Sequence, residues 1–367
     1  MSEHLTDPPP STPLSLTKGR GAATNVDSRF HAWAREAEVV EAWPEEELPP
    51  VQTIVSLQRG RSIISRNESP DIPFDRSINP YQGCEHGCVY CYARPSHAYW
   101  GLSPGLDFET RILAKENAAE LLVKELAKPG YAPRWVALGA NTDPYQPAEK
   151  RLRITRSVLE VLSQCRHPVG ITTKSALVTR DIDLLAPMAA QGLAHVMISI
   201  GSLDPELART LEPRANSPQR RIEAIRRLSQ AGIPVGVIVA PVIPALNDHE
   251  IESVLEAAAG AGAVTAGHVL LRLPLEVAKL FTEWLELHHP QRAAHVMSVL
   301  RQMRAGQVND PRFGARMRGE GPFARILSQR FALAARRLGL LRERAPLNTA
   351  LFRPPPRDPV QSDLFGA

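Results

Sequence analysis

The chain has 367 residues, of which 43% are hydrophobic and 22% are charged, proportions typical of a soluble globular protein. The formal net charge of +4 is a small excess, and four cysteines, three of them clustered, argue against a disulfide framework. They fit a reducing compartment in which the thiols serve a metal. The N-terminus contains no apolar signal-peptide core, and no apolar stretch is long enough to span a bilayer. We therefore expect a cytoplasmic protein with no membrane contact.

Two N-terminal segments are expected to precede the main domain. Residues 1–29 contain four prolines and little apolar periodicity, so we predict a disordered segment there. Residues 30–76 are predicted to form an N-terminal extension that is irregular for most of its length. Within it, the pattern indicates a short helix around Phe30 to Trp43 and a strand at Ile63–Ser65.

From Ser77 onward, short apolar runs alternate with helical patterns. The predicted strands are Ser77–Tyr81, Trp135–Gly139, Val169–Thr173, His195–Ile200, Val235–Pro241 and His268–Leu273. The predicted helices between them are Glu116–Lys128, Thr155–Cys165, Asp181–Gln191, Pro218–Ala231 and Asp248–Ala261. This order predicts βα units around a parallel sheet, and six units are too few for a closed eight-stranded barrel. We predict an α/β fold over residues 77–274, with a partial (β/α)6 TIM-like barrel.

The C-terminal region, residues 275–344, is predicted to be helical and rich in arginine. Its expected helices are Glu276–His289, Pro290–Ala305 and Phe323–Leu341. Residues 301–344 contain eleven arginines against three acidic residues, a local excess of eight positive charges. Such a region can follow a phosphate backbone, or it can form a solvated helical face. Residues 345–367 form a proline-rich tail that we expect to be extended.

Three cysteines with the spacing CxxxCxxC fall within Cys84–Cys91, directly after the first predicted strand. An iron–sulfur cube normally takes four thiolates, so three would leave one iron open to bind and activate a small molecule. The alternative is a structural zinc site with His86 or His97 as the fourth ligand, although zinc sites favour paired CxxC spacing. Cys165, the remaining cysteine, is expected to be buried on the apolar face of a helix.

The cysteine motif, with Tyr90 directly before the third cysteine, resembles the radical S-adenosylmethionine (radical SAM) superfamily. The resemblance extends over about Ser77 to Pro274. Within the superfamily, the runs Asn79–Cys84 and Asn141–Pro147 resemble the branch that contains spore photoproduct lyase, a DNA-repair enzyme. The flanking Arg61–Ser65 and the helical C-terminal part resemble an orphan group of that branch, whose reaction is not assigned.

This resemblance implies a [4Fe-4S] cluster on Cys84, Cys88 and Cys91, whose fourth iron chelates S-adenosyl-L-methionine (SAM). One electron from a reductant protein such as flavodoxin or ferredoxin would then cleave SAM and give a 5′-deoxyadenosyl radical that abstracts hydrogen from the substrate. Read with the predicted strand ends, the resemblance implies that the cofactor-binding residues are Tyr90, Asn141, Thr142, Asp143, Thr173, Lys174, Ser175, Ser199 and Arg214.

Each of these residues has an expected role and an alternative. Tyr90 is expected near the adenine, and Asp143 is expected to pair with the amino group of SAM. An Asx turn before Pro144 is the alternative for Asp143 and Asn141. Lys174 would meet a carboxylate or phosphate, and Arg214 would bind a carboxylate through its planar fork. The serines and threonines at the strand ends would face the ribose or simply cap the strands.

The resemblance to spore photoproduct lyase is incomplete. No cysteine follows the second predicted strand, where a hydrogen-atom donor would be expected, so we do not predict thymine-dimer repair. Tyr145 is expected to relay a radical or to pack, and Glu149 to hold a substrate or to pair with Lys150 or Arg151. The sequence names no catalytic residue.

We expect a radical SAM enzyme that acts on nucleic acid, in DNA repair or in base modification. The alternatives are radical SAM modification of tRNA, a peptide or a small metabolite, and a non-catalytic metal-stabilised module that binds DNA or RNA. The tail segment Gln361–Phe365 resembles the peptide by which bacterial repair and replication proteins bind the sliding clamp. Its glutamine would serve as a polar anchor and its Leu-Phe pair would fill an apolar pocket.

Overall fold

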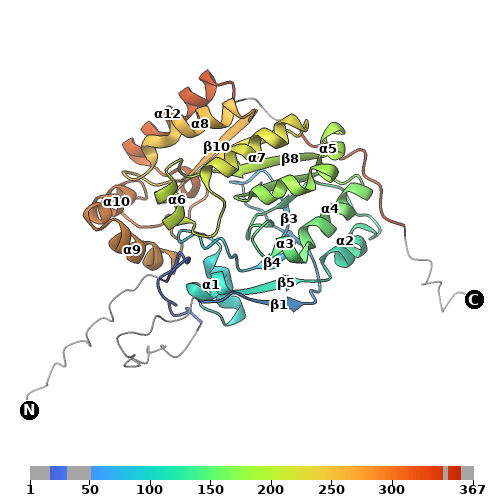
Figure 1. Ribbon diagram of the computed structural model, residues 1–367, viewed down its shortest axis with the longest axis horizontal. Helices are drawn as coiled ribbons and strands as arrows, with labels where there is room; N and C mark the ends of the chain where they lie inside the picture. The colour runs from blue at the N-terminus through green and yellow to red at the C-terminus, as the bar shows by residue number, and fades with distance from the viewer. Residues whose placement is uncertain (1–16, 31–50, 342–345, 357–367) are drawn as a thin grey trace, which may run out of the picture.

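The computed structural model describes residues 17–30, 51–341 and 346–356. Its main sheet has seven strands, which are β2 (Ile64–Arg66), β3 (Arg76–Ile78), β6 (Val136–Leu138), β7 (Val169–Thr173), β8 (Ala194–Ser199), β9 (Val235–Val242) and β10 (Thr265–Leu270). They are hydrogen-bonded in the order β10-β9-β8-β7-β6-β3-β2 (Figure 1). Every neighbouring pair is parallel except β2 and β3.

The six parallel strands lie where the alternating pattern predicts them. Strands β3 and β6 are buried along their whole length, as expected for strands covered on both faces. The sheet does not close, because β2 and β10 are both edge strands. The predicted α/β fold with an open, partial barrel is therefore confirmed, and β2 lies at the strand predicted over 63–65.

Helices connect and cover the parallel strands. The longer ones are α2 (Ala118–Leu126), α4 (Ile154–Gln164), α5 (Ile182–Ala190), α7 (Pro218–Gln230) and α8 (Ile251–Gly260). The shorter ones are η1 (Arg94–Trp100), α1 (Leu106–Thr110), α3 (Glu149–Leu152), η2 (Ala176–Asp181), α6 (Pro205–Leu211) and η3 (Asp248–Glu250). Apolar positions such as Val158 and Leu162 of α4 form one core with the sheet. Cys165, which follows α4, is buried in this core as predicted.

A second, three-stranded sheet is absent from the sequence prediction. It consists of β1 (Ile54–Gln58), β4 (Tyr81–Gln82) and β5 (Arg111–Lys115), in the order β1-β5-β4. The segment that contains β1 was expected to be irregular. Three of the five residues of β1 are exposed, so it lacks the apolar run that marks a buried strand.

The N-terminal segment differs from the predicted disorder over 1–29. Residues 17–29 are packed on the protein, and Ala22 and Val26 are buried in a second apolar cluster that also contains Leu271 and Trp284. Residues 1–16 and 31–50 lie outside the described residues, and with them most of the helix expected around Phe30 to Trp43. Residues 17–29 are ordered by contacts with segments that are distant in the sequence, and the amino-acid composition of the segment itself cannot predict such contacts.

The C-terminal region is helical, as predicted. Its helices are α9 (Val277–His288), α10 (Pro290–Gln302), α11 (Ala315–Arg318) and α12 (Gly321–Arg337). Helix α12 packs along α8, and α9 packs on α10 at the opposite side of the molecule from α2 and α4 (Figure 1). None of the helices in the described part of the chain is both long and apolar enough to cross a membrane.

Many arginines of this region have partners within the protein. Arg330 pairs with Glu252 at 2.7 Å, and Arg337 pairs with Glu256. The other three that form hydrogen bonds within the protein are Arg304, Arg312 and Arg316. Five of the nine described arginines in residues 301–344 are therefore bonded internally, so the excess of positive charge available on this surface is smaller than the sequence indicated.

Residues 346–356 form a strap along the amino-terminal edge of the main sheet. The backbone N–H of Asn348 donates to the carbonyl of Gly192 at 2.9 Å, and the N–H of Arg353 donates to the carbonyl of Cys165 at 2.8 Å. The ring of Phe352 packs on Tyr131 and on the adjoining His167, with centroids 5.4 Å apart in both contacts. Residues 357–367, with the clamp-like motif, lie outside the described residues.

Replacing Phe352 by Ala should lower the free energy of unfolding by about 2 kcal/mol, because the aromatic contacts that hold the strap are lost. Equilibrium urea unfolding measures the change. Leu333→Ala is the matched control, since Leu333 is 65% exposed, and it should change stability by less than about 0.5 kcal/mol. Equal stability of the Phe352→Ala protein and the wild type would show that the strap adds nothing to the fold.

Candidate functional site

The sequence-predicted site residues come together at the carboxyl-terminal edge of the parallel strands. The cysteine loop follows β3 and β4, the run Asn141–Pro147 follows β6, and Lys174 follows β7. Ser199 ends β8, and Arg214 lies between α6 and α7. In barrels of βα units this edge carries the chemistry.

The three cysteines of the motif are free thiols of one loop between β4 and η1. Cys84 and Cys88 are buried, and Cys91 is half-buried. The N–H of Cys84 donates to the carbonyl of Phe108 at 2.9 Å, and the N–H of Cys91 donates to the carbonyl of Cys88 at 3.2 Å. The loop is thus folded back on itself and fastened to the helix α1 behind it.

A buried ion pair holds the backbone of this loop. The guanidinium of Arg94 donates from Nε to the carbonyl of Cys88 at 2.9 Å and from Nη2 to the carbonyl of Gly87 at 3.3 Å. The same guanidinium pairs with Glu109, and neither side chain reaches solvent. Breaking a buried pair by removing one partner typically costs about 3–5 kcal/mol, because the other charge is left uncompensated. The sequence offered no signal for this pair.

The N-terminal segment covers the outside of the cysteine loop. The carboxylate of Glu109 accepts hydrogen bonds from the N–H of Gly21 at 3.0 Å and from the N–H of Ala22 at 2.8 Å. A Cβ atom at position 21 would lie 1.8 Å from the carbonyl oxygen of Gly87, so only glycine fits there. Residues 20–22 therefore form an outer wall over the loop.

The thiols lie close enough to affect one another's ionisation. Burial raises the pKa of Cys84, and Asp143, Cys88 and Cys91 raise it further. Burial also raises the pKa of Cys88 to about 12, while the nearby Lys174 acts in the opposite direction. Thiolates at these positions need a bound cation, and a set of sulfur donors without nitrogen or oxygen suits an iron–sulfur cluster.

The zinc alternative finds no support in the geometry. Within residues 17–30, 51–341 and 346–356, no group of three His, Cys, Asp or Glu side chains is placed to hold a single metal ion. The Nδ1 atom of His86 lies 3.3 Å from Oδ2 of Asp143. His97 packs edge-on against Phe108 at 5.5 Å. His86 thus lies beside Asp143, and His97 lies beside Phe108.

A buried polar network fixes Tyr90. Its hydroxyl donates to Glu212, and Glu212 also pairs with Arg221 of α7. The ammonium of Lys174 lies 5.8 Å from the centre of the Tyr90 ring. Burial by itself would lower the pKa of Lys174, but Cys88 and Glu212 outweigh it, so the pKa is raised and the side chain stays protonated. Sequence reasoning missed Glu212 and Arg221, although Glu212 stands two residues before the predicted Arg214.

Asp143 joins the loop after β6 to the end of β7. Its Oδ1 accepts the hydroxyl of Thr173 at 2.6 Å and the N–H of Tyr145 at 2.9 Å, and its Oδ2 accepts the N–H of Lys174 at 2.8 Å. Burial would raise its pKa, but His86 and these donors lower the pKa to about 2. The Asx turn offered as the alternative is therefore present at Asp143, and its pairing with a cofactor amino group stays a prediction.

The predicted hydroxyl residues are already bonded within the fold. Thr142 donates to a carbonyl of β4 at 2.8 Å, and Ser199 donates to a carbonyl of β9 at 3.3 Å. Ser175 caps η2, where it accepts an N–H at 3.2 Å. These hydrogen bonds correspond to the alternative role of the three residues, in which they cap the ends of helices and strands. Binding of ribose by any of them stays a prediction.

Polar contacts from Gln146 and Arg214 connect the cysteine loop to its neighbours. The side chain of Gln146 accepts the N–H of Glu85 at 3.0 Å and donates to the carbonyl of Gly83 at 3.1 Å. Arg214 pairs with Glu85 at 3.3 Å. The N–H of Asn141 is bonded to a side chain of the β3–β4 turn at 3.0 Å. The Asn141–Pro147 run thus fixes the cluster loop in position, a role that its resemblance alone did not indicate.

Tyr145 and Glu149 pack rather than face the site. The hydroxyl of Tyr145 donates to Asp181 at 3.0 Å. The fully buried carboxylate of Glu149 accepts the N–H of Thr155 at 2.9 Å and pairs with Arg180 at 2.7 Å. For Tyr145 the contacts correspond to packing, one of its two alternatives. Glu149 pairs with a cation, but that cation is Arg180 and not the predicted Lys150 or Arg151, because α3 and η2 meet in the fold.

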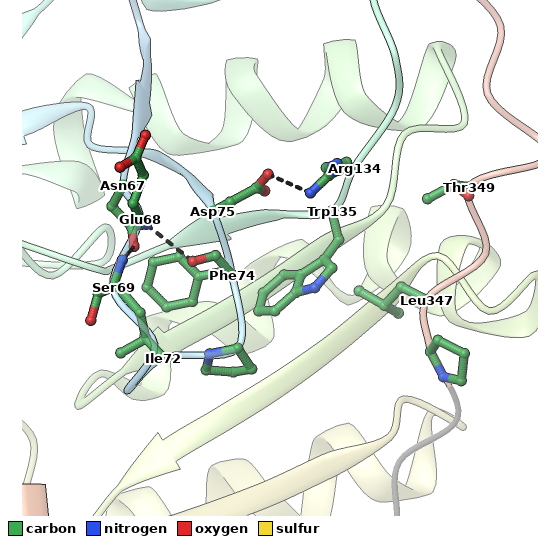
Figure 2. Close-up of a pocket in the computed structure, with 12 residues that line it drawn as sticks. Asn67, Glu68, Ser69, Ile72, Phe74, Asp75, Arg134, Trp135, Leu347 and Thr349 are labelled. Atoms are coloured by element: carbon green, nitrogen blue, oxygen red, sulfur yellow. Dashed lines mark hydrogen bonds and ion pairs between the residues drawn. The ribbon is translucent and has the colours of Figure 1, made fainter. Parts of the chain in front are cut away.

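A cavity of about 570 Å³ lies away from the cysteine loop, at the amino-terminal ends of β3 and β6. Figure 2 shows Phe74 and Trp135 at its centre, Leu347 of the strap beside them, and the ion pair of Asp75 with Arg134 at 2.9 Å. It contains no nucleophile activated by a neighbour and no cluster of sulfur donors. None of the three cysteines of the motif lines this cavity.

The sequence profile of the radical SAM superfamily matches residues 78–258. A protein of Mycobacterium tuberculosis, named Uncharacterized protein Rv2578c, is 34% identical over 290 residues, which cover 74% of this chain and 85% of that relative. The chain belongs to the radical SAM superfamily. A second relative of this radical SAM protein, Uncharacterized protein MJ0683 of Methanocaldococcus jannaschii, is 31% identical over 178 residues, or 47% of this chain and 62% of the relative.

The fold of the radical SAM protein also has a counterpart among solved structures. A mutant of spore photoproduct lyase matches with a TM-score of 0.52 at 14% identity, over 77% of this chain and 79% of that chain. At this identity the likeness concerns the fold alone. Membership of the superfamily makes the protein a radical SAM enzyme and implies SAM and a [4Fe-4S] cluster as its cofactors.

Substituting Gly21 by Ala should displace residues 20–22 from the cysteine loop. Losing their hydrogen bonds to Glu109 should speed the alkylation of Cys84 and Cys88 in the metal-free protein by roughly tenfold. Iodoacetamide labelling followed by peptide mass spectrometry measures this rate. Gly260→Ala is the matched control, because nothing lies within 4 Å of a Cβ there. Equal labelling rates in both variants would show that residues 20–22 do not shield the thiols.

Proposed function

We propose that this radical SAM enzyme holds a [4Fe-4S] cluster on Cys84, Cys88 and Cys91 and cleaves SAM reductively to start radical chemistry. The observation that carries the proposal is a set of three free thiols in one loop at the carboxyl edge of the sheet. The fourth cysteine is buried in the core behind α4 and supplies no further ligand. When bound, the cluster would supply an iron with a free position that chelates SAM and an electron that breaks its sulfonium bond.

The chain's own residues would bind and orient the cofactor. Lys174, protonated beside Cys88, would attract an anionic group such as the SAM carboxylate. Tyr90 would offer its ring for contact with the adenine, because Glu212 fixes its hydroxyl. The pair of Arg94 with Glu109 would keep the loop backbone in place. These assignments are supported by position at the sheet edge and by charge.

The substrate belongs to the same proposal. A nucleic acid, modified or repaired at a base, stays our leading prediction, and tRNA, a peptide or a small metabolite are the alternatives. The internally bonded arginines of the C-terminal region weaken the electrostatic case for a long phosphate backbone. A flavodoxin or ferredoxin as reductant, a cytoplasmic location, and a sliding clamp bound through Gln361–Phe365 also stay predictions.

Replacement of Cys88 by Ala should abolish cluster binding and SAM cleavage, because the remaining two thiolates cannot hold the cluster. Anaerobic reconstitution followed by absorption spectroscopy, iron content and dithionite-driven formation of 5′-deoxyadenosine measures both losses. Cys165→Ala is the control, and it should retain both properties. A Cys88→Ala protein that still forms 5′-deoxyadenosine would falsify the proposal.

A further inference from the structure

One cationic side chain at the site is used by none of the interactions described above. Arg272 follows β10 at the carboxyl edge of the sheet, and its Cζ atom lies 5.6 Å from the centre of the Tyr92 ring. Tyr92 directly follows the last cysteine of the motif, and its hydroxyl donates to the carbonyl of Ala140 after β6. Arg272 therefore lies across the sheet edge from the strands that carry the cysteine loop, and Tyr92 connects the two.

Solvent reaches this place. Tyr92 is 49% exposed, although Val89 in the cysteine loop is fully buried. An exposed aromatic residue directly after a buried metal loop marks the side from which a substrate can approach. The residues that meet there are Tyr92 and Arg272.

The guanidinium of Arg272 has almost no acceptor. Its one hydrogen bond goes from Nη1 to the sulfur of Met317 at 3.3 Å, and a thioether is a weak acceptor. Its Nε atom is buried and has no partner. In the described part of the chain, no carboxylate forms an ion pair with Arg272. The half-buried guanidinium therefore has one weak acceptor within the protein and one buried N–H without a partner.

The surroundings add further positive charge. Arg304 is buried and donates only to carbonyls, at 2.6 Å to Leu271 and at 2.8 Å to Arg316. Burial, together with the charge of Arg272, lowers the pKa of Arg304 to about 10, and Asp310 acts in the opposite direction. The guanidinium of Arg316 pairs with Asp71, in the loop between β2 and β3.

Asp71 is paired with Arg316 and also acts on Arg272, and Asp310 acts on Arg304, so the three guanidinium groups outnumber the carboxylates near them. Burying a charge without a counter-charge is costly, and an anion bound at Arg272 would offset that cost. The planar fork of arginine matches the two oxygens of a phosphate or carboxylate. Lys174, the other cation of the site, lies by contrast against Tyr90 and Glu212, on the side of the cysteine loop.

We propose that Arg272 is the anchoring residue for an oxyanion of the substrate, a phosphate or a carboxylate, which enters beside Tyr92. The inference rests on the proposed function in taking the bound group as substrate. Arg304 and Arg316 would add positive charge beside Arg272 without contacting the ligand. The anion would orient the substrate over the exposed face of Tyr92, next to the cysteine loop.

The test uses the anaerobically reconstituted enzyme with SAM present, and the wild type also with SAM left out. Inorganic phosphate is titrated and followed by ³¹P line broadening, and acetate is titrated in parallel by ¹³C line broadening. The variants are Arg272→Gln, Arg272→Lys and Arg325→Gln, the last replacing an exposed arginine of α12. Far-ultraviolet circular dichroism checks that each variant folds.

Saturable binding of phosphate or acetate by the wild type and by Arg325→Gln is expected. Binding should weaken roughly tenfold or more in Arg272→Gln, with Arg272→Lys between them, because lysine keeps the charge and loses the fork. Tighter binding of phosphate than of acetate would assign a phosphate-bearing substrate, and the reverse order would assign a carboxylate.

Three results would overturn the inference. They are equal anion binding in Arg272→Gln and the wild type, no saturable binding by the wild type with or without SAM, and saturable binding by the wild type only when SAM is left out, which would assign Arg272 to the cofactor. The same preparations are assayed for 5′-deoxyadenosine. A wild type that binds the anion but does not cleave SAM would contradict the proposed function. A wild type that cleaves SAM but does not bind the anion would contradict only the role of Arg272 as substrate anchor.

Discussion

The cysteine loop depends on one buried ion pair, Arg94 with Glu109. A loop whose backbone carbonyls point inward needs donors, and a single guanidinium supplies them to the carbonyls of residues 87 and 88. The partner carboxylate then binds the N-terminal segment through two N–H groups. Because both charges are fully buried, neither has water as a substitute partner. The shape of the thiol loop and the order of residues 20–22 are therefore coupled.

The parts of the fold that could be predicted from sequence are those with a local signature. The parallel strands are short apolar runs, and the cysteine spacing is specific, so both were located from the chain alone. Cys165 was correctly expected to be buried, because its helix has a clear apolar face. The roles of Arg94, Glu109 and Gly21 could not be predicted, since each depends on contacts between segments that are distant in the sequence.

In the candidate site, too, local patterns could be predicted from the sequence and long-range contacts could not. Tyr90, Asp143 and Lys174 do lie together, as the strand-end argument predicts. Their exact contacts depend on Glu212 and Arg221, which carry no motif and come from the segments around α7. Likewise, the excess of arginine in the C-terminal region was visible in composition. Which of these arginines find carboxylates, such as Arg316 with Asp71, depends on a contact across 245 positions of the chain.

The strap formed by residues 346–356 lies on the side of the sheet opposite the thiol loop. It is fastened to Gly192 and Cys165, ahead of β8 and β7, so it runs along the edge of the sheet that faces away from the thiol loop. Residues 348–353 therefore lie on the side of the molecule away from the thiols. A partner bound on this side would leave the thiol loop uncovered, so such binding need not compete with a cofactor or substrate for the same surface.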